Sequence, residues 1–162
     1  MLQLVPIPAW DSIHPLIVHF PIALLIVAPL FVVLALLAPR SSRAFAAAAL
    51  LLMTIGTAGA VIAVETGEAA AQLADRTPAV NEVLERHQEL AELTRNTFLA
   101  LTVVFAAIVI VPAMLKRRFS RGSVIAAHAV FLVLYLGGLF LLVNTAHNGG
   151  RLVHQLGVHS LL

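Results

Sequence analysis

Residues 15–38 read PLIVHFPIALLIVAPLFVVLALLA and contain no Asp, Glu, Lys or Arg. A helix of this length, rising about 1.5 Å per residue, crosses the roughly 30 Å hydrocarbon core of a bilayer. The chain begins MLQLVPIPAW, without the basic segment of a secretory signal peptide, and the apolar run is too long for one. Residues 15–38 are therefore predicted to stay in the protein as a first transmembrane helix.

Three further apolar segments follow, at about residues 44–64, 97–115 and 123–145. Of the 162 residues, 60% are hydrophobic and only 11% are charged, which is more apolar surface than a soluble domain can hide. The spans must be helices, because lipid offers no partner to backbone N–H and C=O groups. The sequence predicts an all-α fold, a single four-helix transmembrane bundle over residues 1–162.

The connectors after the first and third spans hold six of the ten Lys and Arg residues: Arg40, Arg43, Lys116, Arg117, Arg118 and Arg121. The positive-inside rule puts both connectors in the cytoplasm, and hence both termini on the periplasmic side of a bacterial inner (cytoplasmic) membrane. All eight acidic residues and six of the seven histidines then lie at the outer side, with His128 as the exception. The lipid bilayer is the expected partner, and no nucleic-acid surface is expected, because the cations do not gather on one face.

The connector between the second and third spans carries its own helix signal. Thr77 suits an N-cap and Pro78 the first helical position. A mostly apolar stripe at helical spacing follows, formed by Val80, Val83, Leu84, His87, Leu90, Ala91 and Thr94. The opposite face is charged. We therefore expect an amphipathic outer helix over about residues 78–96, an extramembrane extension of the third span whose stripe faces the bundle.

Histidines near the outer side are the candidate chemical residues. His14 stands at the entrance of the first span, and His19 lies about 7 Å deeper by helical rise. An ionisable group at membrane depth predicts a functional site, the alternative being an interfacial imidazole bonded to a backbone carbonyl. His87 is expected to face the bundle because its polar neighbours point away from the stripe. The alternative is that His87 only packs within the stripe and makes one hydrogen bond.

The C-terminal segment holds three more histidines: His147, His154 and His159. Asn148-Gly149-Gly150 is typical of a helix end, so the fourth helix is expected to stop there and the remaining residues to lie on the outer face. His154 and His159 are interpreted as surface residues. Arg95 and Arg151 lie near the outer boundary, either as interfacial anchors or as cations for the acidic groups of a cofactor.

Small residues recur at three- and four-residue steps on the second span: Gly56, Ala60, Ala63 and Gly67. This spacing favours close helix packing, and the alternative is a slot for a flat cofactor. Gly137-Gly138 on the fourth span is open to the same two interpretations. The chain has no cysteine, which excludes disulfides, iron–sulfur clusters and covalent c-type haem.

Four motifs together resemble a known family: HPLIVHFPIALL from residue 14, ETG at 65–67, HQELAELT at 87–94 and GGRLVHQLGV at 149–158. The resemblance is to a bacterial membrane family catalogued as domain of unknown function 2231, and it covers nearly the whole chain. Some members of that family are fused to c-type cytochrome modules, which implies a redox setting. The family pattern is commonly aromatic at the position of His154, so His154 is not taken as a site residue.

The leading hypothesis is a membrane-embedded electron-transfer protein that binds haem b, alone or as a subunit of a respiratory or photosynthetic complex. Haem b needs imidazole ligands and an apolar slot but no cysteine. His19 and His87 are the expected axial ligands, with His14 or His147 as substitutes and with Arg95 and Arg151 near the propionates. The expected partners are redox or membrane-complex proteins.

Two other hypotheses stay open. One is an outer-face site for Zn or Cu, with His19 and His87 as the expected ligands and with His14, His147 and Glu65 as further candidates, since imidazole and carboxylate suit both metals. The other is a structural accessory subunit without a cofactor. No catalytic residue is predicted in any of the three cases.

Overall fold

The computed structural model describes residues 9–116 and 119–158, and within them it is all-helical. The helices are α1 (His14–Ile17), α2 (His19–Leu37), α3 (Ser42–Ala71), α4 (Pro78–Met114) and α5 (Arg121–His154). Helices α1 and α2 meet at Val18 and together form one apolar segment, His14–Leu37. The result is four helices long and apolar enough to cross a membrane, which confirms the predicted fold class.

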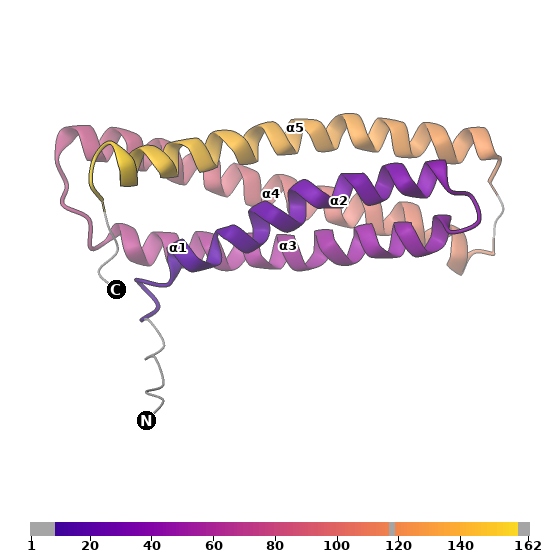
Figure 1. Ribbon diagram of the computed structural model, residues 1–162, viewed down its shortest axis with the longest axis horizontal. Helices are drawn as coiled ribbons and strands as arrows, with labels where there is room; N and C mark the ends of the chain where they lie inside the picture. Colours follow the sequence, from indigo (N-terminus) through magenta and orange to yellow (C-terminus); the bar gives the residue numbers. More distant parts are fainter. Residues whose placement is uncertain (1–8, 117–118, 159–162) are drawn as a thin grey trace, which may run out of the picture.

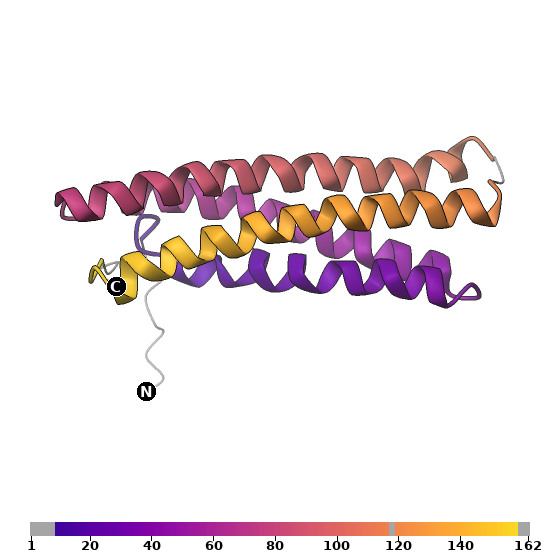
Figure 2. The same cartoon turned by 90° about the horizontal axis from the view of Figure 1, so that it is seen from above.

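The four long helices run antiparallel to their neighbours and form a closed ring (Figures 1 and 2). Helix α2 packs against α3 and α5, and α4 packs against the same two helices. Within the described residues, the diagonal pairs α1/α2 with α4 and α3 with α5 have no Cα atoms within 8 Å of each other. The first and last described segments, the start of α1 and the end of α5, lie at the same end of the bundle, as expected for four spans (Figure 1).

The two ends of the bundle carry opposite charge. All eight acidic residues lie at the end where α3 gives way to α4, which we call the acidic end. The opposite, basic end holds Arg40, Arg43, Lys116 and Arg121. Arg117 and Arg118 belong to the same connector but lie outside the described residues.

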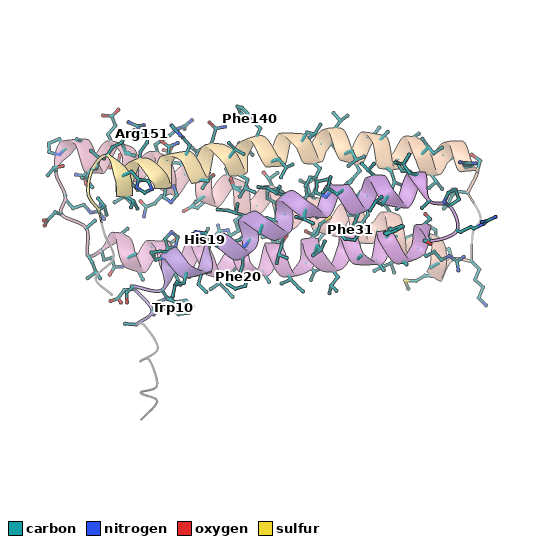
Figure 3. The ribbon with its side chains drawn as sticks, in the orientation of Figure 1. Trp10, His19, Phe20, Phe31, Phe140 and Arg151 are labelled. Atoms are coloured by element: carbon teal, nitrogen blue, oxygen red, sulfur yellow. The ribbon has the colours of Figure 1, made fainter. Side chains whose placement is uncertain are left out.

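The core of the bundle is aromatic and aliphatic. Phe98 and Tyr135 pack edge to face with ring centroids 5.3 Å apart, and the tilted rings of Phe105 and Phe131 have centroids 4.8 Å apart. Large apolar side chains also cover the outside, for example Phe140 at 70% exposure, which Figure 3 labels on α5. A surface of this kind is stable against lipid chains and unstable in water.

Pro29 explains one polar contact in this core. Proline has no backbone N–H, so the carbonyl of Leu25, one turn earlier on α2, loses its helical partner. The hydroxyl of Tyr135 on α5 donates to that carbonyl at 2.8 Å. The tyrosine thereby satisfies a buried acceptor and joins α2 to α5 across the bundle.

Helices α3, α4 and α5 are longer than the apolar segments from which they were predicted. Helix α4 is one helix of 37 residues, about 55 Å long, so the expected outer helix over 78–96 and the third span are continuous. Its stripe is buried at Val80, Val83 and Leu84. The prediction that residues 148–150 end the fourth helix is wrong, because α5 continues to His154.

Candidate functional site

A cavity of about 360 Å³ lies between the helices at the acidic end of the bundle. Its walls come from α1, α3, α4 and the last turns of α5, and most of the lining side chains are small or aliphatic. Among the polar groups in the lining are the imidazoles of His14 and His87. Both are partly buried.

His14, on α1, is oriented by Thr66 on α3. The Thr66 hydroxyl lies 3.2 Å from Nδ1 of His14 and 2.9 Å from the carbonyl of Ile62, one turn earlier on its own helix. Since that hydroxyl donates its hydrogen to the carbonyl, its oxygen accepts from the imidazole. A neutral His14 therefore carries its proton on Nδ1 and keeps the lone pair on Nε2.

His87, on α4, is oriented by the backbone of α5. Its Nδ1 lies 3.0 Å from the carbonyl oxygen of Thr145. A carbonyl only accepts hydrogen bonds, so the ring donates from Nδ1 and again keeps the lone pair on Nε2. The hydroxyls of Thr94 on α4 and Thr145 on α5 lie 2.8 Å apart and join the same two helices. Within the described residues, neither Nε2 has a hydrogen-bond partner.

Each imidazole fits against a glycine of the neighbouring helix. A Cβ added at Gly67 would lie 2.9 Å from Cε1 of His14, and one at Gly149 would lie 3.0 Å from Cε1 of His87. Both distances are too short for a side chain to be present without moving the ring. Gly149 stands four residues after Thr145, so the missing Cβ lets the His87 ring reach that carbonyl.

The two halves of the chain build the site in the same way. In the hairpin of α1/α2 with α3, the first helix supplies an imidazole and the second supplies its Nδ1 partner and a glycine. The hairpin of α4 with α5 repeats this arrangement. Because α1 and α4 occupy opposite corners of the ring, the two imidazoles approach the cavity from opposite sides.

Carboxylates and an amide complete the polar lining. Asp11, Glu68 and Glu92 contribute carboxylates and Gln88 an amide, while the described lining contains no Lys or Arg. Arg95 and Arg151, expected near the acidic groups of a cofactor, do not line the cavity. Arg95 instead donates to the side chain of Asn96, and Arg151 donates to the side chains of Asn148 and Gln155.

His19, an expected axial ligand, does not line the cavity, because position 19 is exposed on α2 (Figure 3). The buried stripe of that helix runs through Pro21, Leu25 and Ala28, on the other side. His147 and His154 are exposed as well, and His159 lies outside the described residues. His128 is buried near the basic end, where its Nδ1 donates to the carbonyl of Val124 at 2.9 Å.

The described residues contain no group of three or more His, Cys, Asp or Glu side chains that could hold a metal ion. The expected Zn or Cu site, built on His19 and His87, therefore finds no ligand cluster in this part of the chain. The two imidazoles that line the cavity at the acidic end are those of His14 and His87, on different helices and without a third close ligand among the described residues.

Comparison with known proteins adds one finding. Residues 11–161 match the model of the family described as "Predicted membrane protein (DUF2231)". The chain belongs to this family. The matched residues include all four sequence motifs on which the resemblance to the DUF2231 family was based. No curated protein and no solved structure matches the chain.

Two site residues of this DUF2231 protein had no clear signal in the sequence. Gly149 was interpreted as part of a helix end, although it serves the His87 ring from within α5. Thr145 takes part through its backbone carbonyl, which no side-chain pattern reveals. The sequence did give a signal for two other site residues: Thr66 and Gly67 both belong to the ETG segment, one of the four motifs that resemble the family.

Proposed function

We propose that this membrane protein binds haem b between His14 and His87 and works as an electron carrier. One observation carries the proposal: imidazoles from opposite corners of a helix bundle line one cavity, each with Nδ1 already bonded and Nε2 free. Metal-bound histidines nearly always donate their other ring N–H to such a second partner. Cofactor sites in bundles are built from side chains on facing helices.

The donor set favours haem over a bare metal ion. A structural zinc site needs four protein ligands, and the described cavity supplies no cluster of three. Haem iron brings four ring nitrogens of its own and takes only one or two axial ligands from the protein. A cavity of about 360 Å³ with small and aliphatic walls is also within the range for a bound organic group.

Haem, when bound, supplies one-electron redox chemistry, and the chain's own residues prepare the site for it. His14 and His87 would hold the iron through Nε2, while Thr66 and the Thr145 carbonyl keep the rings in the required tautomer. Leu84 and Leu152 are buried and contribute apolar wall to the cavity. We assign no catalytic residue, and the acidic end would exchange electrons with redox or membrane-complex partner proteins.

The positive-inside rule supports a location for this site. With Arg40, Arg43, Lys116 and Arg121 in the cytoplasm, the acidic end and its cavity face the periplasm of a bacterial inner membrane. Both termini then lie on that side.

The test is an ultraviolet–visible spectrum of the purified protein, oxidised and then reduced. We expect a Soret band with b-type reduced features, lost or shifted in His14→Ala and in His87→Ala. His19→Ala and His147→Ala are the matched controls, since both residues are exposed, and they should keep the wild-type spectrum.

Other outcomes point elsewhere. Loss of the band in His19→Ala with retention in His14→Ala would reject the ligand pair. Colourless protein with bound zinc or copper would favour the metal hypothesis, and protein free of haem, zinc and copper would favour a structural accessory subunit.

A further inference from the structure

A second cavity lies at the opposite end of the molecule. It has a volume of about 440 Å³ and opens between the last turns of α4 and the first turns of α5. Its walls are almost wholly apolar, with Ile108, Val111 and Pro112 on one side and Phe119, Val124 and Ala127 on the other. It is independent of the histidine site and of the function proposed for that site.

Two exposed cations follow the walls of this groove toward the basic end, although neither lines it. Lys116 lies two residues after the last residue of α4, Met114, and Arg121 is the first residue of α5, so one cation adjoins each wall in sequence. Arg121 precedes His128, at the buried end of the groove, by seven residues, or about 10 Å of helix. A molecule that fits this groove therefore has an anionic head and a long apolar tail.

We propose that the groove binds an anionic phospholipid, with its phosphate between Lys116 and Arg121 and an acyl chain along Val111, Val124 and Ala127. Basic pockets between membrane helices on the cytoplasmic side recognise anionic head groups through the same combination of charge and apolar depth. His128 closes the deep end. Its Nδ1 is bonded to the carbonyl of Val124, and its ring packs edge-on to Phe105 with ring centroids 5.9 Å apart, so these two contacts set the orientation of the ring.

Native mass spectrometry in micelles doped with phosphatidylglycerol or phosphatidylcholine tests this site. We expect wild-type protein to retain phosphatidylglycerol preferentially. In the double variant Lys116→Gln/Arg121→Gln, retention should fall about thirtyfold, because each surface cation contributes about 1 kcal/mol toward an anionic lipid. The matched control, Arg40→Gln/Arg43→Gln, removes two cations from the other basic connector and should retain the lipid.

Filling the groove gives a second, charge-neutral test. Ala127→Trp places a large side chain in the groove and should release phosphatidylglycerol, whereas Ala129→Trp, at an exposed position outside the lining, should not. The proposal is overturned if both double variants lose lipid equally, if Ala127→Trp retains it, or if phosphatidylcholine is held as well as phosphatidylglycerol.

Discussion

Gly149 and Gly150 are adjacent residues on α5, yet they meet different surroundings. A Cβ at Gly149 would meet the His87 ring, while one at Gly150 would meet nothing within 4 Å. Both lie inside the helix rather than at its end. Glycine costs a helix about 1 kcal/mol relative to alanine, and of the two positions only 149 places the missing Cβ against the imidazole.

This pair makes a sharp prediction. Gly150→Ala should stabilise the protein by about 0.5–1 kcal/mol, since it only lowers the entropy of the unfolded chain. Gly149→Ala should destabilise it by about 1 kcal/mol, because the displaced His87 ring loses its bond to the Thr145 carbonyl. Thermal unfolding of both variants in detergent measures the difference. Equal shifts in the same direction would show that the ring does not depend on Gly149.

At the scale of residues, the sequence predicted that His87 faces the bundle, but it did not predict that His14 is the second imidazole in the same cavity. Charged neighbours on α4 define which face is buried, so the inward orientation of His87 followed from helical spacing. The first span is apolar all round, and no such contrast tells which side meets the bundle. The choice between His14 and His19 therefore depended on packing, which turns Pro21 and Leu25 inward and His19 outward.

At the scale of elements, hydropathy predicted the existence of four helices but not their ends. The apolar criterion stops where polar residues begin, whereas α3 and α5 continue to Ala71 and His154. Continuation depends on tertiary contacts at the acidic end, where Ala71, Val80, Leu84 and Leu152 share a small second core. That core stabilises the last turns of α5, although the segment Asn148-Gly149-Gly150 by itself favours the end of a helix.

The link between α2 and α5 is testable by a double-mutant cycle. Tyr135→Phe should destabilise the wild type by about 0.6–2 kcal/mol, because the Leu25 carbonyl then has neither a helical nor a tyrosine donor. Pro29→Ala restores a backbone N–H to that carbonyl. In the Pro29→Ala background the same tyrosine change should therefore cost less, and unfolding in a denaturing detergent measures the coupling. Equal costs in both backgrounds would contradict the account of Pro29.

For the whole molecule, the opposite charges of the two ends predict sidedness. The chain has no cysteine, so a single cysteine substitution introduces one thiol whose accessibility can be measured by labelling. In intact cells a membrane-impermeant maleimide should label Asp75→Cys, between α3 and α4, and should not label Ser41→Cys, between α2 and α3. After lysis both should react. The reverse pattern in intact cells would invert the orientation and move the histidine cavity to the cytoplasm.

The contribution of one imidazole from each hairpin has a consequence for biogenesis. Helices enter the membrane in chain order, so α1 to α3 are in place before α4 and α5. A half-inserted chain, with α1 to α3 in place, holds His14 but not His87. A ligand that needs both rings therefore has no complete site until α4 has been inserted. Under the proposed function, capture of the haem would be a late step that follows insertion of α4.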